Sequence, residues 1–347
     1  MSFCLSGSSS VRFFLILVSI FHLGFCKADS ILKAPATKYI STGHAKVAVV
    51  GIGFVGSSAA YALMLKNIAA ELILVDVNVD RCDGEVLDLS DALSFSSASK
   101  VVAGTLQDAA KADIIVITAG RNRIVKGDKS RLDLLDANTK IMSFIIKEML
   151  PINPRAVILV VSNPVDVMTY VAQELSDLPR SQVLGSGTWL DTQRLRNLLS
   201  LKLGIAQESV NAFVLGEHGD SQFVGWSSAC VAGLPLYSFP EMTEEKCAKY
   251  AYDTKTKAYE IIQRKGATFF GIGACVADIC ENIIFNQQRV MPVSSFHEEY
   301  GACLGMPSIV GENGLQEVLY PPLSPKEQIQ LEKSAETLRG VIKKLDL

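Results

Sequence analysis

The sequence lacks a strong net charge and lacks the cysteine pattern of a disulfide or zinc scaffold. Its 33 Lys and Arg residues and 36 Asp and Glu residues leave a formal net charge of -3. This balance excludes a protein built to coat nucleic acid or an anionic membrane. The eight cysteines form no C-x-x-C pair and have no regular spacing. Free thiols in a reducing compartment, and no metal site, are therefore expected.

What the chain has is length and apolar content. It contains 347 residues, of which 49% are hydrophobic and 20% charged. At roughly 100–200 residues per domain, this composition predicts a soluble chain of two globular domains.

Residues 1–42 differ from the rest and are predicted to be an N-terminal extension. Residues 1–28 contain no acidic residue, and an apolar run extends from Phe13 to Phe25. This run is shorter than the ~20 residues that cross a bilayer. It suits a signal peptide cut before Lys27, with small residues Gly24 and Cys26 at the required positions. The alternatives are a transit peptide and an extension with no role in the fold. The polar residues after the cut, Lys27–Thr42, indicate a linker or an N-terminal arm.

A glycine-rich turn between a strand and a helix indicates a dinucleotide-binding motif. Strands are predicted at Lys46–Val50 and Glu71–Val75, with a helix at Ser57–Asn67 between them. The turn reads Gly51-Ile52-Gly53-Phe54-Val55-Gly56, and Asp76 follows twenty residues later. An ordinary strand–helix turn that happens to be rich in glycine is the alternative.

Each part of this motif has a physical reason. Gly51 permits a tight turn, Gly53 lets the backbone approach a pyrophosphate at the helix start, and Gly56 lets helix and strand pack closely. Asp76 would accept hydrogen bonds from a ribose and repel a 2′-phosphate, which favours NAD over NADP.

Further strands and helices predict an α/β fold. Strands at Asp113–Thr118 and Ala156–Val161 are apolar throughout, as in parallel sheets covered on both faces, and a helix is predicted at Leu132–Leu150. We therefore expect an N-terminal Rossmann-type, doubly wound parallel sheet over residues 43–185. The pattern then changes to long helices and short strands, which predicts a C-terminal α+β substrate domain over residues 186–347.

One histidine stands out as a candidate acid–base group. His218 lies between glycines in Gly216-Glu217-His218-Gly219-Asp220-Ser221, after a predicted strand. The other three histidines are His22 in the extension, His44 just after it, and His297 in a Glu-rich stretch. His218 is thus the residue expected to exchange a proton near neutral pH.

Three other polar residues could complete a site. Asp191 and Arg194 are three residues apart on a predicted helix, so both can point into one cavity, with Arg194 clamping a substrate carboxylate. A surface ion pair is the alternative for the two. Asn163 follows a strand and could bond a carboxamide or substrate oxygen, or simply form a turn before proline. Residues 121–130 include four Lys or Arg residues and one glycine, which predicts a lid.

Taken together, these motifs resemble the L-lactate and malate dehydrogenase superfamily over roughly residues 45–345. The matching segments, in family order, are GIGFVG, Asp76, TAG, SRLDLLDANTKI, SNPVD, GSGTWLDTQRLR, GEHGDS and KGATFFGIG. The resemblance implies NAD as cofactor and a small 2-hydroxy or 2-keto acid as substrate. It also implies a homotetramer or homodimer in the cytoplasm, with an organelle or the secretory route as the alternative if the N-terminal segment is a working signal.

The resemblance also assigns roles to residues. It implies His218 as proton donor and acceptor, Asp191 as its orienting partner and Arg131 as the lid arginine that polarises the carbonyl. Substrate contacts are implied for Arg194, Asn163, Arg131, Arg123 and Thr268. Cofactor contacts are implied for Gly51, Gly53, Phe54, Val55, Gly56, Asp76, Thr118, Ala119, Gly120, Asn138, Ser162 and Asn163.

Substrate choice rests on one lid position, which is Gln in lactate enzymes and Arg in malate enzymes. Counting forward from Gly120 gives Arg123, whereas counting back from Arg131 gives Val125, because this lid is two residues longer than the family pattern. Arg123 facing the substrate predicts malate, and Val125 predicts lactate. Thr268 and the GSGTWLDTQRLR segment favour L-lactate and pyruvate, with malate and oxaloacetate as the alternative.

Two further points follow from the resemblance. An inactive family member that serves as a binding or structural protein is disfavoured, because His218, Asp191, Arg194 and Arg131 are all present. Some relatives bind a sugar bisphosphate through an Arg and a His. Arg196 occupies the Arg position here, but Asn211 replaces the His, which argues against such activation.

Overall fold

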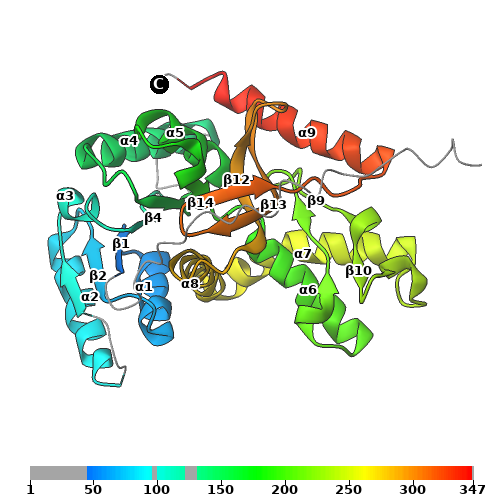
Figure 1. The fold of residues 1–347 in the computed structure, drawn as a ribbon, viewed down its shortest axis with the longest axis horizontal. Coiled ribbons are helices and arrows are strands. Elements are labelled where there is room, and N and C mark those ends of the chain that lie inside the picture. Colours follow the sequence, from blue (N-terminus) through cyan, green and yellow to red (C-terminus); the bar gives the residue numbers. More distant parts are fainter. Residues whose placement is uncertain (1–44, 96–99, 122–130, 346–347) are drawn as a thin grey trace, which may run out of the picture. The chain divides into compact units, whose positions relative to one another are not determined.

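The glycine turn lies inside a strand–helix–strand unit at the start of the sheet (Figure 1). The computed structural model describes residues 45–95, 100–121 and 131–345, without the side chains of residues 131–133. Strand β1 (Lys46–Val50) leads through the turn into α1 (Phe54–Lys66), and β2 (Glu71–Val75) follows. The helix begins at Phe54 rather than at the predicted Ser57, because Gly53 is already its extended N-cap residue.

All described residues belong to one unit of the chain, Tyr39–Leu347. The predictions made for residues 1–42, including the signal peptide and the cut before Lys27, lie outside the described residues. Within the described ranges, no helix combines the length and the apolar character needed to cross a membrane.

Six parallel strands form the first part of the sheet. With β3 (Lys100–Ala103), β4 (Ile114–Ile117), β5 (Val157–Val160) and β6 (Val183–Gly185), the order is β6-β5-β4-β1-β2-β3. The strand order reverses between β1 and β4, and ligands of such sheets bind at the carboxyl ends of the strands at this reversal. The predicted doubly wound Rossmann-type fold is confirmed.

Alternate residues of these strands pack into two cores on opposite faces of the sheet. One core joins every second residue of β1, β4 and β5 to α4 (Arg131–Met149) and α5 (Val165–Leu175). The other joins the intervening residues to α1 and to α8 (Phe270–Ile284). Because helices cover both faces, the strands can be apolar throughout, as the sequence shows.

The second half of the chain mixes helices and short strands, as the α+β prediction requires. Helices α2 (Val79–Leu93) and α3 (Leu106–Ala109) belong to the first half of the chain. Besides α8, the second half contains α6 (Trp189–Leu203), α7 (Glu244–Lys265) and α9 (Pro325–Ile342). The remaining strands are β7 (Val210–Asn211), β8 (Val214–Leu215), β9 (Phe223–Val224), β10 (Cys230–Val231), β11 (Leu234–Pro235), β12 (Arg289–His297), β13 (Ala302–Gly311) and β14 (Gly314–Val318).

The two halves share one sheet. Strand β12 pairs antiparallel with β6 through Ser294 and Gly185, and β13 and β14 extend the sheet to nine strands. The domain boundary predicted after Gly185 therefore falls at the end of β6, within a continuous sheet, and the division into two domains stays a prediction.

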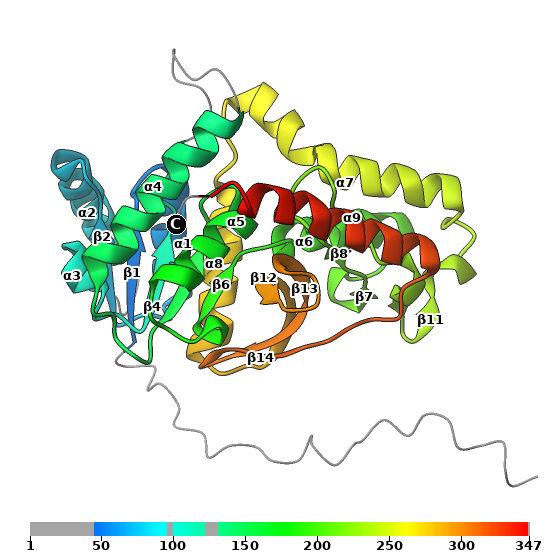
Figure 2. The same cartoon turned by 90° about the horizontal axis from the view of Figure 1, so that it is seen from above.

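Helices of the second half also cover the first half. Helix α8 runs beside α1 on one face (Figure 1), so closely that a Cβ on Gly273 would lie 2.8 Å from the backbone carbonyl of Ser58. On the other face, α9 packs along α5 and β13 (Figure 2), and its residues Leu331 and Ala335 join the first core.

The histidine that the sequence places in a Glu-rich stretch is in fact buried. His297 is the last residue of β12 and is 2% exposed. Its Nδ1 lies 3.2 Å from the Tyr320 hydroxyl, and its Nε2 lies 3.3 Å from the Ser295 hydroxyl. Burial lowers the pKa of His297 to about 4.

We predict that this histidine makes the protein less stable in acid. Between pH 6.5 and 4 the unfolded chain binds a proton on residue 297 that the folded chain does not bind, so up to about 3 kcal/mol of stability is lost as the pH falls. The variant His297→Gln lacks this titration. Urea unfolding at several pH values is expected to show the stability gap between wild type and variant narrowing toward pH 4. A gap that does not change with pH would contradict the assignment.

Candidate active site

The glycine turn leaves open space at the start of α1. A Cβ on Gly51 would lie 2.5 Å from the backbone of Ala119, and one on Gly56 would lie 2.1 Å from the carbonyl oxygen of Gly51. A Cβ on Gly53 would meet no atom within 4 Å. The outer glycines are therefore required for packing, whereas the middle one faces open space at the helix start, whose free N–H groups are suited to bind the pyrophosphate of a dinucleotide.

Asp76 at the end of β2 holds this turn. One carboxylate oxygen accepts a hydrogen bond from the Ile52 N–H at 2.7 Å, and the other accepts from the Asn78 N–H at 2.9 Å. The carboxylate is thus placed beside the turn, where it can also meet a ribose. Phe54, the first residue of α1, is 65% exposed, and Val55 is partly exposed.

The loops after β1, β4 and β5 are joined by side-chain hydrogen bonds. The Thr118 hydroxyl donates to the Gly51 carbonyl at 2.5 Å, and the Ser162 hydroxyl donates to the Ala119 carbonyl at 2.5 Å. Asn138 is buried, and its amide donates to the Asn163 carbonyl at 2.7 Å. A Cβ on Gly120 would lie 3.5 Å from Asn138. Three of the predicted cofactor contacts (Thr118, Asn138 and Ser162) therefore fix the backbone of the site.

Asn163 itself is exposed at the end of β5. Its side-chain oxygen accepts a hydrogen bond from the Val165 N–H at 3.3 Å. This bond fits the turn that the sequence allowed as an alternative.

The predicted acid–base pair is assembled in the structure. The Nδ1 atom of His218 lies 2.7 Å from one oxygen of Asp191, and the other oxygen accepts a hydrogen bond from Arg194 at 2.9 Å. Only 3% of the Asp191 side chain and 15% of the Arg194 side chain are exposed. The alternative of a surface ion pair is therefore wrong, because the pair is buried and shares its carboxylate with His218.

The charges in this group shift each other's proton affinity. Burial alone would lower the pKa of His218, but the charge and hydrogen bond of Asp191, together with the charge of Asp166, raise it above the ordinary histidine value. Burial would raise the pKa of Asp191, but the charges of His218 and Arg194 hold it below the ordinary value. Asp191 is thus ionised at neutral pH, and it favours the imidazolium form of His218.

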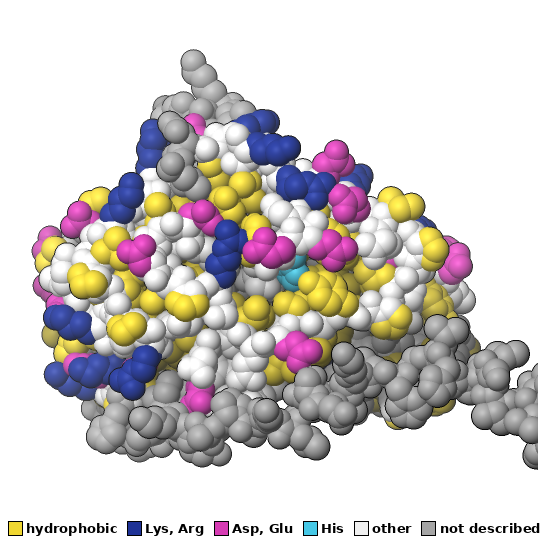
Figure 3. Space-filling view, turned by 45° about the horizontal axis from the view of Figure 1, so that its top comes forward, with side chains coloured by type: hydrophobic (Ala, Val, Ile, Leu, Met, Phe, Trp, Pro, Cys, Tyr) yellow, Lys and Arg dark blue, Asp and Glu magenta, His cyan; other side chains and the backbone are white. Residues whose placement is uncertain are grey.

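Hydrogen bonds fasten the strand that leads to His218 onto the helix that carries Asp191. The Thr188 hydroxyl donates to the Val214 carbonyl at 2.6 Å, and the Thr192 hydroxyl accepts from the Val214 N–H at 2.9 Å. Of the two histidines in the described part of the chain, His218 is the partly exposed one. Figure 3 shows a histidine side chain at the surface, among acidic and hydrophobic side chains.

Three residues that contact the His218 loop or its partners were not predicted from the sequence. The Asp166 carboxylate accepts from the His218 N–H at 2.7 Å and from the Ser294 hydroxyl at 2.6 Å. The Ser334 hydroxyl on α9 accepts from the Glu217 N–H at 2.8 Å. Asp166 lies in the SNPVD motif, which was a usable signal. Nothing in the sequence singles out Ser294 or Ser334.

The remaining predicted substrate residues are Arg131, Arg123, Val125 and Thr268. Arg131 is the first residue of α4, but its side chain, like Arg123 and Val125, lies outside the described part. Thr268 is partly exposed and precedes Phe269, whose ring stacks on Phe54 with centroids 5.4 Å apart. The structure therefore brings the Thr268 segment against the glycine turn.

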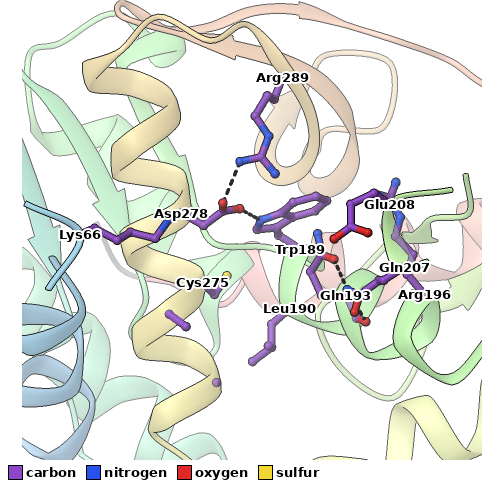
Figure 4. A pocket seen from close by; sticks show the side chains of 12 residues that line it. Lys66, Trp189, Leu190, Gln193, Arg196, Gln207, Glu208, Cys275, Asp278 and Arg289 are labelled. Carbon is purple, nitrogen blue, oxygen red and sulfur yellow. Dashed lines mark hydrogen bonds and ion pairs between the residues drawn. The ribbon is translucent and has the colours of Figure 1, made fainter. Parts of the chain in front are cut away.

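A pocket of about 570 Å³ lies between α6 and α8, and no predicted catalytic, substrate-binding or cofactor-binding residue lines it (Figure 4). In its wall, Asp278 accepts hydrogen bonds from the Trp189 indole at 2.8 Å and from Arg289 at 2.7 Å. These bonds hold the start of α6, which carries Asp191. Arg196 also lines the pocket, and burial together with the charge of Arg289 lowers its pKa to about 10. No group of acidic, histidine or cysteine side chains among the described residues could hold a metal ion.

A glycine turn at the strand reversal, together with a buried Asp–His pair, defines a nucleotide-dependent oxidoreductase. Residues 45–185 match the lactate/malate dehydrogenase NAD binding domain, and residues 188–346 match the lactate/malate dehydrogenase alpha/beta C-terminal domain. The chain belongs to the lactate/malate dehydrogenase family, and NAD is its cofactor.

Individual relatives are similar over most of their length. The chain is 48% identical to L-lactate dehydrogenase A of Rhizopus oryzae, over 86% of this chain and 92% of that protein. It is 42% identical to an L-lactate dehydrogenase of Acetivibrio thermocellus, over 87% and 98%. A crystal structure of a minor L-lactate dehydrogenase from Enterococcus mundtii, in a ligand-bound form, superposes with a TM-score of 0.84 at 39% identity, covering 88% of this chain and 99% of that one.

Two glycine variants separate packing from cofactor binding. Gly56→Ala is expected to cost about 1–3 kcal/mol of stability, because its Cβ would overlap the Gly51 carbonyl. Gly53→Ala is expected to melt like wild type but to bind NADH about tenfold or more weakly, because its methyl group enters the open space at the helix start. Thermal melting and NADH fluorescence titration measure the two effects. Wild-type NADH affinity in Gly53→Ala would show that the cofactor does not approach there.

Proposed function

We propose that this chain is an NAD-dependent L-lactate dehydrogenase that interconverts pyruvate and L-lactate. The observation that carries the proposal is the buried carboxylate of Asp191. It bonds both a histidine that can exchange a proton and an arginine that can hold a substrate carboxylate. The relatives reported above are named L-lactate dehydrogenases, which supports lactate over malate.

The proton chemistry follows from the orientation of His218. Its Nδ1 is held by Asp191, so the ring presents Nε2 for proton exchange. In pyruvate reduction, the imidazolium gives this proton to the carbonyl oxygen while C2 receives a hydride, and lactate oxidation reverses both transfers. Bound NADH would supply the hydride that reduces C2, and bound NAD⁺ would accept it in the reverse direction. Asp191 stabilises the charged imidazolium and fixes its orientation.

Arg194 is placed to bind the substrate carboxylate. One terminal nitrogen already bonds Asp191, and the guanidinium has further N–H donors that can form a two-point contact with a carboxylate. We assign Arg131 to polarising the carbonyl, Asn163 to a substrate and nicotinamide contact, and Thr268 to narrowing the substrate pocket. Closure of the lid would exclude water and strengthen these charged contacts.

The same proposal extends to organisation and location. We propose that residues 43–185 form the NAD-binding domain and residues 186–347 the substrate domain, which the ranges of the two family matches support. The resemblance supports a homotetramer or homodimer. The six described cysteines are free thiols, which supports a cytoplasmic location.

Substrate preference tests the proposal. Purified full-length protein is expected to oxidise NADH with pyruvate at a kcat/KM about tenfold or more above that with oxaloacetate, because a second carboxylate would have no cationic partner if Val125 rather than Arg123 faces the substrate. Loss of NADH absorbance measures both rates. A preference for oxaloacetate would show that Arg123 pairs the second carboxylate and that the chain is a malate dehydrogenase. Failure to bind NADH or to turn over either acid would point to the inactive, binding or structural member of the family.

A further inference from the structure

An aromatic stack joins the glycine turn to the segment that carries Thr268. Phe54 is the first residue of α1, and Phe269 is the N-cap residue of α8. Their ring centroids lie 5.4 Å apart, with an angle of 28° between the planes, which is a stacked arrangement. The helix start that is suited to bind a pyrophosphate is therefore in direct contact with the residue that follows Thr268.

The ring of Phe269 has close partners besides Phe54. The ammonium of Lys265, the last residue of α7, lies 3.5 Å from the centroid of Phe269 and 4.3 Å from that of Phe270. Phe270 meets Phe269 edge-on, with centroids 4.5 Å apart. A cation over an aromatic face and an edge-on pair of rings are both attractive arrangements. Phe269 is thus held at the junction of α7 and α8.

Phe54 is held less firmly than Phe269. It is 65% exposed, and its second partner, the Arg81 guanidinium, lies 5.9 Å from its centroid. A ring so exposed gains little from burial of its apolar surface. Beside it, a Cβ on Gly53 would meet no atom within 4 Å. Phe54 therefore has room to leave the stack and turn toward this open space, here called the cofactor space.

The stack is not needed to join the two helices. Helices α1 and α8 lie side by side (Figure 1), and buried residues of both belong to the second core. What the stack reaches is the connection between α7, capped by Gly266, and α8, which begins at Phe270. Within the described ranges, no hydrogen bond joins Thr268 to another residue. The position of Thr268 therefore depends on its neighbour Phe269.

We infer that the Phe54–Phe269 stack is a positioning contact that couples the cofactor space to the substrate pocket. A dinucleotide at the helix start fills the space beside Gly53, so the ring of Phe54 stays on Phe269, and Phe269 in turn fixes Thr268. The inference rests on the proposed function, which assigns Thr268 to the substrate pocket. Because coupling is reciprocal, a substrate analogue must strengthen NADH binding by the factor by which NADH strengthens binding of the analogue.

The test measures this coupling by equilibrium binding to the full-length protein. NADH is titrated by fluorescence with and without a fixed concentration of oxamate, an unreactive analogue of pyruvate, and the ratio of the two dissociation constants is the coupling factor. Phe269→Leu keeps an apolar side chain but removes the stack. It is expected to lower the coupling factor about three- to tenfold, the effect of one aromatic pair. Phe269→Tyr keeps the ring and is expected to behave like wild type.

The stack can also be removed from its other side. Phe54→Leu is expected to lower the coupling factor as much as Phe269→Leu, and the double variant is expected to lower it no further, because all three lack the same contact. A change in NADH affinity alone cancels in the ratio. Phe54→Leu changes an exposed residue, so it serves if Phe269→Leu does not fold. An unchanged factor in both single variants, or losses that add in the double variant, would overturn the inference.

A second readout needs neither substrate nor turnover. Amide hydrogen exchange of peptides that cover residues 266–269 is followed by mass spectrometry with and without NADH. NADH is expected to slow exchange in wild type and to slow it much less in Phe54→Leu. If wild type does not bind oxamate or reduce pyruvate but exchange follows this pattern, the coupling to the Thr268 segment stands and the proposed function fails. Equal protection in Phe54→Leu, or none in wild type, overturns the inference.

Phe296→Leu is the matched control. Phe296 is also a partly exposed ring with a cation over its face, the Arg180 guanidinium at 3.7 Å, and an aromatic neighbour, Tyr170, at 6.0 Å. None of these three residues belongs to the predicted site. The substitution is expected to lower stability but to leave the coupling factor in place. An equal loss of coupling would show that removal of any packed ring has this effect, and would overturn the specific role of the stack.

Discussion

The carboxylate of Asp191 is the interaction on which the site depends. A charge that is 3% exposed must be paired, and here an arginine one helical turn away and a histidine from a distant loop share the pairing. The imidazole therefore has one orientation, with Nδ1 toward the carboxylate. The guanidinium is fixed beside it. Because a single buried anion positions both groups, the imidazole of His218 and the guanidinium of Arg194 keep a constant separation.

The rest of the fold keeps this carboxylate in place. Thr188 and Thr192 fasten α6 to the strand that leads to His218, while Asp278 holds the start of α6 through Trp189. On the other side of the loop, Asp166 and Ser334 bond consecutive peptide N–H groups, those of His218 and Glu217. The loop is thus bonded to α5, α6 and α9, and through them to both cores of the sheet.

Local features of the fold could be predicted from residue spacing, and the contact between His218 and Asp191 from the family resemblance, whereas the other tertiary contacts could not. The glycine turn and the apolar parallel strands depend on residue spacing over a few positions, so the sequence pattern alone predicts them. The pairing of β12 with β6, which makes one sheet of nine strands, has no local signal. The same holds for Ser294 and Ser334, whose partners lie 128 and 117 residues away. The burial of His297 could not be predicted from the glutamates that follow it, because it depends on β12, of which His297 is the last residue.

We propose that His218, held by Asp191, carries the proton of the reaction. The most direct measurement is the turnover of pyruvate with NADH by His218→Asn, alongside NADH affinity from fluorescence titration. We expect turnover to fall by about 10²–10⁴ with NADH affinity unchanged, because only proton exchange is removed. Turnover close to wild type would contradict the proposal and would require another acid–base group.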